Sequence, residues 1–200
     1  KVALMQNSSP AVERLQIKPY NWWNEALHGV GRAGLATVFP QSIGMAASFD
    51  NVLLYDVFTA VSDEARAKTR LAREEGNYDI YRGLTFWTPN INIFRDPRWG
   101  RGHETYGGDP YLTTRLGVRY IKGLQGDGKY LKVAACAKHF ACNNQEDNRN
   151  YVSSNLSERA LREIYLRGFE ICVKEAQPWT VMTSYNVING RRTCECFELI

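Results

Sequence analysis

The sequence predicts an α/β fold, a parallel (β/α)₈ TIM-barrel-like domain over residues 1–200 that is incomplete at its C-terminal end. Short apolar runs at 84–87, 133–137 and 180–184 alternate with longer amphipathic segments, the pattern of parallel βα units. A complete barrel takes about 250 residues, so the chain is expected to lack the final strands. An open doubly wound sheet is the alternative, but no glycine-rich phosphate-binding turn follows any of these runs.

The N-terminal part of the chain is predicted to hold one long helix. An apolar start at 1–5, a loop over 17–34 and a short helix over 41–47 precede it. Asp50 is a favourable N-cap, and the helix should run to about Glu74. Its buried face follows from helical spacing and comprises Leu54, Val57, Phe58, Val61 and Ala65.

Two more helices should follow the first two apolar runs. Asp109 and Pro110 supply a cap and a first-turn proline for a helix to about 124. Ser157 caps the other, which should run to about 176 with Leu161, Ile164, Tyr165, Gly168 and Cys172 facing inward. Asn189-Gly190 is expected to turn the chain into a last helix.

Composition narrows the possible partners. The net charge of +4 comes from basic residues spread along the chain, without the basic stripe of a nucleic-acid-binding protein. No segment approaches the roughly 20 apolar residues of a membrane span, and no signal peptide is recognised, so the sequence indicates no compartment. Five cysteines without regular spacing do not form a disulfide framework, and Cys136 and Cys172 are expected in the core.

The most chemically dense stretch is 92–106, NIFRDPRWGRGHETY. It follows an apolar run and carries three arginines and two carboxylates, which can give fixed, directional hydrogen bonds to a polar ligand. A purely structural ion-pair network that locks two barrel segments together is the alternative.

The ends of the predicted strands carry groups that suit a sugar. Lys138 offers donors, His139 a donor and an acceptor, Arg101 a rigid fork of donors, and Glu25 can accept from two hydroxyls. The rings that could stack on apolar sugar faces are Trp22, Trp23, Trp87 and Trp99.

Structural alternatives apply to each of these residues. Lys138 could be a buried partner of Glu146 or Asp147, and each tryptophan could belong to the core. The three histidines could be satisfied by backbone groups, or could bind a metal together with Glu25 or Glu104. No metal-binding motif supports the last possibility, so no metal or cofactor is expected. The histidines are His28, His103 and His139.

Five segments together resemble the N-terminal domain of glycoside hydrolase family 3, of the bacterial β-xylosidase and β-glucosidase type. They occur in the family's order and cover nearly the whole chain. One departure is Gly108, where the family's motif commonly has Glu. The segments are YNWWNEALHG at 20–29, ATVFPQSIGMAASFD at 36–50, TPNINIFRDPRWGRGHETYGGDP at 88–110, AACAKHFACNNQE at 134–146 and VMTSYNVING at 181–190.

The resemblance implies a retaining, exo-acting β-glycosidase that takes an oligosaccharide. Its catalytic Asp nucleophile and its acid/base would both lie beyond Ile200, in the remaining barrel strands and a C-terminal domain. Without the resemblance, Glu25 and Glu104 would be the candidates for the two carboxyl groups of such an enzyme. The positions that match the family's substrate-binding residues are Glu25, Trp87, Arg101, Lys138, His139, Arg149 and Tyr185, of which Arg149 matches least closely.

Three functional hypotheses follow. The chain could be a fragment of a β-glycosidase, inactive alone, or a non-catalytic carbohydrate-binding fragment. A third possibility is an aldolase-like barrel in which Lys138 forms a Schiff base. Within the first hypothesis Glu25 favours β-D-xylose over β-D-glucose, because glucose-specific relatives commonly carry the shorter Asp at the matching position.

Overall fold

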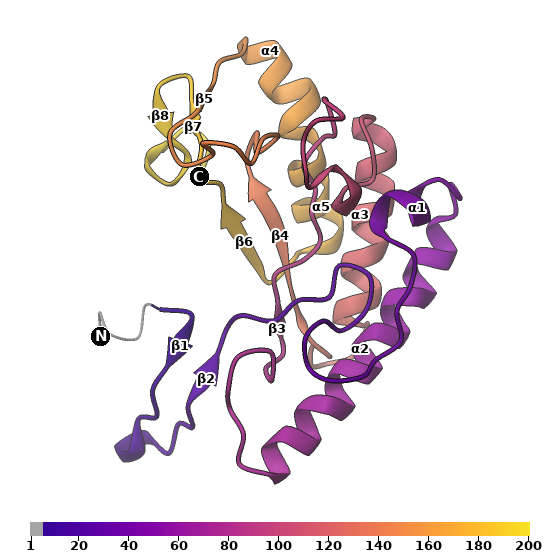
Figure 1. The fold of residues 1–200 in the computed structure, drawn as a ribbon, viewed down its shortest axis with the longest axis vertical. Coiled ribbons are helices and arrows are strands. Elements are labelled where there is room, and N and C mark those ends of the chain that lie inside the picture. The colour runs from indigo at the N-terminus through magenta and orange to yellow at the C-terminus, as the bar shows by residue number, and fades with distance from the viewer. Residues whose placement is uncertain (1–5) are drawn as a thin grey trace.

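The computed structural model describes residues 6–200, so the apolar start predicted at 1–5 lies outside the described residues. Its centre is a parallel sheet of β3 (Thr85–Phe86), β4 (Ala134–Phe140) and β6 (Thr180–Thr183), in the order β3-β4-β6. Helices α2 (Asn51–Glu74), α3 (Pro110–Gln125) and α5 (Arg167–Ala176) lie side by side along one face of this sheet (Figure 1). The predicted α/β fold with a parallel sheet is therefore confirmed. Within residues 6–200 the sheet stays open, and it does not close into a barrel.

Helix α2 (Asn51–Glu74) has the bounds that the sequence predicts. The Asp50 carboxylate accepts hydrogen bonds from the backbone amides of Val52 and Leu53, at 2.9 and 3.0 Å. These bonds satisfy amides that have no partner inside the helix. The predicted apolar stripe is confirmed, with Val57 half-buried at its edge and the other four positions buried.

Helix α3 (Pro110–Gln125) packs against α2 and also begins as predicted. Asp109 accepts a hydrogen bond from the Leu112 amide at 2.7 Å, and Pro110 occupies the first turn. The two helices approach closely at Gly123, where an added Cβ would lie 2.4 Å from the backbone oxygen of Tyr55. The short helix α1 (Ser42–Ala46) confirms the prediction over 41–47.

The predicted helix over 157–176 is interrupted. Ser157 caps α4 (Glu158–Ala160) as expected, but a π-helical turn over Leu161–Tyr165 separates it from α5 (Arg167–Ala176). The extra residue in this turn changes the phase of the helix. Leu161, Gly168 and Cys172 are nevertheless buried as predicted, and a Cβ added at Gly168 would lie 2.8 Å from the side chain of Ile91. Ile164 and Tyr165, which straight helical spacing places inward, are only half-buried.

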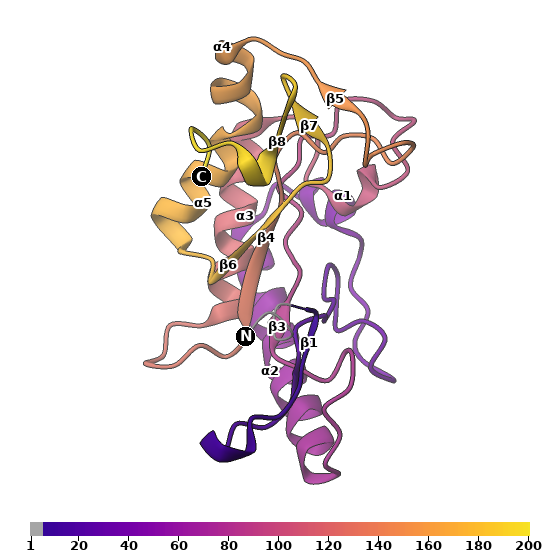
Figure 2. The ribbon, with the colours of Figure 1, turned by 90° about the vertical axis from the view of Figure 1, so that its left-hand side faces the viewer.

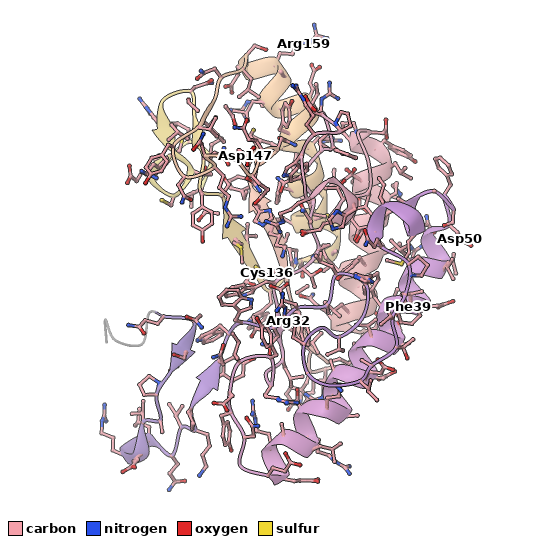
Figure 3. All side chains as sticks on the ribbon, viewed as in Figure 1. Arg32, Phe39, Asp50, Cys136, Asp147 and Arg159 are labelled. Atoms are coloured by element: carbon pink, nitrogen blue, oxygen red, sulfur yellow. The ribbon has the colours of Figure 1, made fainter. Side chains whose placement is uncertain are left out.

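Strand β4 is longer than the sequence predicts. Lys138 and His139 were expected just past its end but lie inside it, because the strand continues to Phe140. Lys138 pairs in register with Met182, and its carbonyl accepts from the Ile91 amide at 2.7 Å. Cys136 lies within the same strand (Figure 3) and is buried, as are Cys142 and Cys172. The expectation that Cys136 and Cys172 are core residues is confirmed.

The prediction that Asn189-Gly190 turns the chain into a last helix is wrong. These two residues instead form the turn of an antiparallel hairpin between β7 (Val187–Ile188) and β8 (Arg191–Arg192). Both have positive φ, 48° and 84°, which is the backbone that a two-residue hairpin turn needs. Strand β5 (Ser153–Ser154) adds parallel to β7, and Figure 2 shows this small sheet beyond the end of β4.

The N-terminal segment forms a second hairpin, β1 (Ser8–Ser9) with β2 (Tyr20–Asn21), and the chain then runs beside β3. The buried Asn24 holds this segment in place. Its side chain donates to the carbonyl of Thr85 at 2.8 Å and accepts from the amide of Gly83 at 2.7 Å. Within residues 6–200 we find no helix that combines the length and the apolar character needed to cross a bilayer.

Candidate active site

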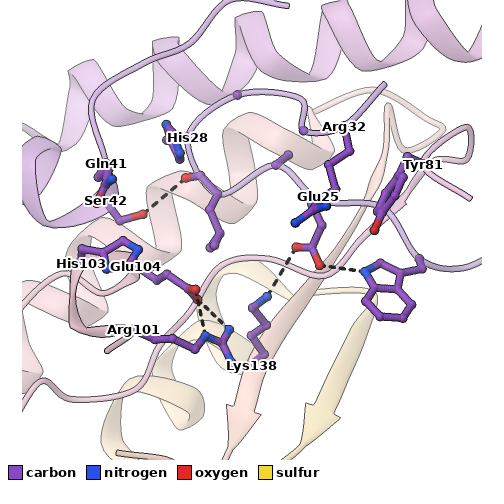
Figure 4. Close-up of a pocket in the computed structure, with 15 residues that line it drawn as sticks. Glu25, His28, Arg32, Gln41, Ser42, Tyr81, Arg101, His103, Glu104 and Lys138 are labelled. Carbon is purple, nitrogen blue, oxygen red and sulfur yellow. Dashed lines mark hydrogen bonds and ion pairs between the residues drawn. The ribbon is translucent and has the colours of Figure 1, made fainter. Parts of the chain in front are cut away.

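A cavity of about 390 Å³ opens between the segment that follows β2, the loop that follows β3 and strand β4 (Figure 4). Three of the predicted ligand-binding residues line it, namely Glu25, Arg101 and Lys138. Trp87, His139, Arg149 and Tyr185 lie outside its wall. Other residues that line it include Trp23, His28, Arg32, Gln41, Ser42, Tyr81, His103 and Glu104.

Lys138 is the most buried charged residue of this wall, with its side chain 5% exposed. Its ammonium lies 3.6 Å from a carboxylate oxygen of Glu25. Burial lowers the pKa of Lys138, and the negative charges of Glu25 and Glu104 partly oppose that shift. The alternative prediction, that Lys138 pairs with Glu146 or Asp147, is therefore wrong. Strand β4 directs the side chain toward the segment beside β3 instead.

Both carboxylate oxygens of Glu25 have protein partners. One accepts a hydrogen bond from the indole N–H of Trp23 at 2.9 Å, and the other faces Lys138 (Figure 4). The Trp23 ring in turn stacks on Trp87, with centroids 4.9 Å apart and planes 25° apart. Trp87 thus contributes to the site by fixing Trp23 and, through it, the Glu25 carboxylate.

Arg101 and Glu104 form a two-pronged ion pair at the other side of the cavity. Arg101 donates from Nε and Nη2 to the two carboxylate oxygens, at 2.8 and 2.7 Å. Burial lowers the pKa of Arg101, but Glu104, together with Glu146 and Glu25, outweighs burial, so the pKa of Arg101 is raised. Burial would raise the pKa of the Glu104 carboxyl, but the neighbouring Arg101 keeps the pKa of Glu104 below its ordinary value. Glu104 is thus an ionised anchor for Arg101, and its oxygens are already occupied.

Glu146 joins the predicted residues that lie outside the cavity to those that line it. Its carboxylate accepts from Arg149 at 2.7 Å and from the indole N–H of Trp99 at 3.1 Å, and lies 3.8 Å from the Arg101 guanidinium. The Arg149 guanidinium sits over the ring of Tyr185, 4.9 Å from its centroid. Arg101, Arg149 and Tyr185 are therefore brought into one connected arrangement.

His139 is buried beside this network. Its Nδ1 lies 2.8 Å from the side-chain oxygen of Asn92, whose amide nitrogen donates to the His139 carbonyl at 2.8 Å. That backbone contact fixes the orientation of the Asn92 amide, so Nδ1 carries the proton and Nε2 is left as the acceptor. Burial, together with the positive charges of Lys138, Arg101 and Arg149, lowers the pKa of His139 to about 2.

The remaining histidines and tryptophans divide between core and surface. His28 is satisfied by the carbonyl of Phe39 at 2.9 Å, whereas His103 is exposed at the cavity. Trp99 is buried, whereas Trp22 is 41% exposed and packs edge-on against Tyr20. In the part of the chain that the structure describes, His, Cys, Asp and Glu form no group of three or more suited to a metal.

Several residues of the site were missed by sequence reasoning. Glu146 was considered only as a partner of Lys138, and Arg32 and Tyr81 were not considered. Asn90 and Asn92 had a usable signal in the sequence, because they interrupt an apolar run. The structure shows that both are buried. Buried amides must find hydrogen-bond partners, and these two bind Glu104 and His139.

Residues 2–196 match the model of the glycosyl hydrolase family 3 N-terminal domain. The chain belongs to glycoside hydrolase family 3. Its relatives in this family include a xylan 1,4-beta-xylosidase of Xylanibacter ruminicola, 45% identical over 100% of this chain and 24% of the relative. A beta-xylosidase/alpha-L-arabinofuranosidase of Medicago sativa subsp. varia is 42% identical over 100% of this chain and 27% of the relative.

Solved structures of the family share the fold. A GH3 exo-beta-xylosidase (XlnD) bound to a xylobiose aziridine probe superposes with a TM-score of 0.87 and 38% identity, over 96% of this chain and 26% of that one. Beta-glucosidase 3B of Thermotoga neapolitana in complex with alpha-D-glucose gives a TM-score of 0.78 and 35% identity, over 96% of this chain and 26% of that one. The chain thus spans about a quarter of the length of the family 3 proteins that it matches.

Proposed function

We propose that this chain forms the sugar-binding wall of a retaining, exo-acting β-glycosidase that releases terminal, non-reducing β-D-xylose, or β-D-glucose, from oligosaccharides. One observation carries the proposal: the Glu25–Lys138 and Arg101–Glu104 pairs meet at a single cavity. Sugar hydroxyls both donate and accept, and this wall presents donors and acceptors side by side.

Most of the charged side chains at the site are paired with one another, which suits a neutral ligand. Three cations, Lys138, Arg101 and Arg149, are matched by three carboxylates, those of Glu25, Glu104 and Glu146. We call these six residues the charge network. Within the charge network a neutral sugar would replace water at groups that are already compensated, and Arg32 is a further cation of the cavity wall outside this network.

The proposed substrate-binding residues combine these contacts with the family resemblance. Lys138 and Arg101 donate to hydroxyls, Glu25 accepts, and His139 offers Nε2 as an acceptor. The full proposed set is Glu25, Trp87, Arg101, Lys138, His139, Arg149 and Tyr185. The nucleophile and the acid/base are proposed to come from parts of the protein outside residues 1–200.

We further propose that additional strands complete a (β/α)₈ barrel next to β6. Within residues 6–200, β6 is an edge strand that pairs only with β4. A groove beside it is lined by the apolar residues Phe140, Phe169, Val173 and Val181 together with charged side chains at its rim such as Arg162 and Glu170, and Val181 is 44% exposed. Such an edge and groove suit a further parallel strand and its helix. These strands and a C-terminal domain would be the partners of this chain.

The test is hydrolysis of nitrophenyl β-xyloside and β-glucoside by the full-length protein. Arg101→Ala and Lys138→Ala should each weaken transition-state binding by about 2–4 kcal/mol, the scale for removing a charged donor from buried hydroxyls. Arg98→Ala is the matched control, because Arg98 lies in the same loop but its side chain is 89% exposed. Wild-type efficiency in both variants would contradict the proposed roles. A sugar bound but never cleaved would instead favour a non-catalytic binding protein.

A Schiff-base reaction at Lys138 is the second candidate. It is favoured by the burial that lowers the Lys138 pKa, because a Schiff-base lysine must lose its proton. The neighbouring Glu25 carboxylate opposes the loss of that proton. Lys138 is therefore better suited to donate hydrogen bonds to sugar hydroxyls than to act as a nucleophile. Borohydride reduction in the presence of a carbonyl compound decides between them, since only an imine leaves a reduced covalent adduct.

A further inference from the structure

Glu146 lies at the junction of two segments that are far apart in the sequence. Trp99 and Arg101 belong to the loop that follows β3, whereas Glu146 and Arg149 belong to the segment that follows β4. The Glu146 carboxylate contacts the side chains of all three other residues, at 3.1 Å (Trp99), 3.8 Å (Arg101) and 2.7 Å (Arg149). Neither of these loops has another carboxylate that contacts both arginines within residues 6–200.

We propose that Glu146 is a positioning residue for glycoside binding, which sets Arg149, and more weakly Arg101, against the substrate. This inference rests on the proposed function and adds to it a residue that does not line the cavity. Glu146 acts through the arginines, and it does not itself need to touch the sugar.

Arg101 and Arg149 differ in the carboxylate that holds them. Arg101 has its own two-pronged partner in Glu104, so loss of Glu146 leaves Arg101 still anchored. Arg149 has no second carboxylate among the described residues, and its other contact is the face of the Tyr185 ring. Arg149 therefore depends on Glu146 for its direction, and its guanidinium also contacts the Tyr185 ring.

An ordinary surface ion pair would contribute little, so burial decides whether Glu146 matters. The side chains of Glu146, Arg149 and Arg101 are 26%, 35% and 21% exposed, well below those of ion pairs on the outer helices. The indole N–H of the buried Trp99 further restrains the carboxylate. A hydrogen bond that involves an ionised group is stronger and more directional than a neutral one, so the charge of Glu146 should matter as well as its shape.

The test compares Glu146→Gln with Asp147→Asn in the full-length protein. Both remove one negative charge from adjacent positions, but Asp147 is exposed, and its side chain has no hydrogen bond or ion pair within residues 6–200. Glu146→Gln should lower kcat/KM for an aryl β-xyloside by about tenfold to hundredfold, as expected when a charge-assisted hydrogen bond is lost. Asp147→Asn should stay within about twofold of wild type.

Double variants separate positioning from a structural role. In an Arg149→Ala background, Glu146→Gln should cost only about threefold or less, since the group through which it acts is gone. An undiminished effect in that background, or equal efficiencies for Glu146→Gln and Asp147→Asn, would overturn the inference. If Glu146→Gln does not fold, Glu146→Asp replaces it. Glu146→Asp keeps the charge but shortens the reach, and it should lose activity in the wild-type background more than in the Arg149→Ala background. A wild-type protein that cleaves no glycoside would overturn the proposed function itself, together with this inference.

Discussion

Both carboxylate oxygens of Glu25 are held by neighbouring side chains. Trp23 and Lys138 occupy one oxygen each, and the stacking of Trp23 on Trp87 restrains the first of these contacts. A side chain fixed at both oxygens cannot swing aside for a larger sugar. The position of this carboxylate therefore sets how much room remains beside the sugar ring.

We predict that Glu25→Asp raises the ratio of glucoside to xyloside efficiency in the full-length protein. Glu reaches one methylene further than Asp and would crowd the exocyclic CH₂OH that glucose has and xylose lacks. One methylene in such a contact is worth roughly 1–3 kcal/mol, or about 10–200-fold in discrimination. Comparing the two nitrophenyl glycosides on both proteins measures the ratio. An unchanged ratio, or a wild-type preference for glucoside, would disprove this assignment.

His139 should make the protein less stable in acid. In the folded protein its pKa is about 2, so it stays neutral. In the unfolded chain an ordinary histidine takes up a proton below about pH 6.5, so the unfolded state binds more protons and stability falls as the pH falls. Between pH 7 and pH 5 the loss is about 2 kcal/mol.

Thermal unfolding at the two pH values checks this expectation. His139→Asn should show a smaller change in Tm between them than wild type, while the exposed His103→Asn should resemble wild type. Equal pH dependence in all three proteins would show that other groups control the acid response.

The site was only partly predictable from residue types. Arg101 and Lys138 were recognised because strand ends and charged loops are where α/β folds place ligand-binding groups. Glu25 was recognised as an acceptor for hydroxyls and through the family resemblance of its segment. The pairing was not predictable, since Lys138 meets Glu25 only because the segment of Asn24 is fastened beside β3. Glu146 could not be assigned either, because its partners come from a different loop.

At the scale of single elements, the α2–α3 contact is the most demanding. Gly123 brings α3 against the α2 backbone, and the atoms nearest to an added Cβ are Tyr55 O at 2.4 Å and Thr59 N at 3.2 Å. Both belong to the main chain, which cannot move aside as the end of a flexible side chain can. This position tolerates no side chain without a shift of one helix.

We therefore expect Gly123→Ala to destabilise the domain by about 1–3 kcal/mol, the usual cost of overpacking. The better helix propensity of alanine returns at most about 1 kcal/mol, which does not offset a contact with backbone atoms. Gly128→Ala is the control, because its nearest neighbour lies at an ordinary 3.5 Å. The Tm of each full-length variant gives the comparison, and an unchanged Tm for Gly123→Ala would contradict this account of the contact.

Elements with local signals were predicted well, and elements that depend on distant contacts were not. Asp50 and Asp109 mark helix starts because a side chain and an amide two or three residues away decide them. The extension of β4 through His139 depends on pairing with β6, and the π turn before α5 accompanies the packing of Gly168 on Ile91. Neither partner is visible in the local sequence.

For the whole molecule, the open edge of β6 predicts how residues 1–200 behave when produced alone. We expect no turnover of an aryl β-xyloside, because the proposed nucleophile is not among them, and losing a nucleophile costs several orders of magnitude in rate.

We also expect residues 1–200 to self-associate through the β6 edge and the groove beside it. Activity assays and light scattering test the two expectations. A monomeric fragment that melts cooperatively would count against an open barrel, and robust turnover against the placement of the nucleophile.

The equal numbers of opposite charges in the charge network have a consequence for ionic strength. Mobile ions screen the attraction between a charged site and a charged ligand, and the Debye length shrinks from about 30 Å at 0.01 M salt to about 3 Å at 1 M. An uncharged sugar is not attracted by the net charge of a site, and within the charge network the cations and carboxylates also cancel. The KM for a neutral xyloside should therefore stay nearly constant across that range of salt in the wild-type protein.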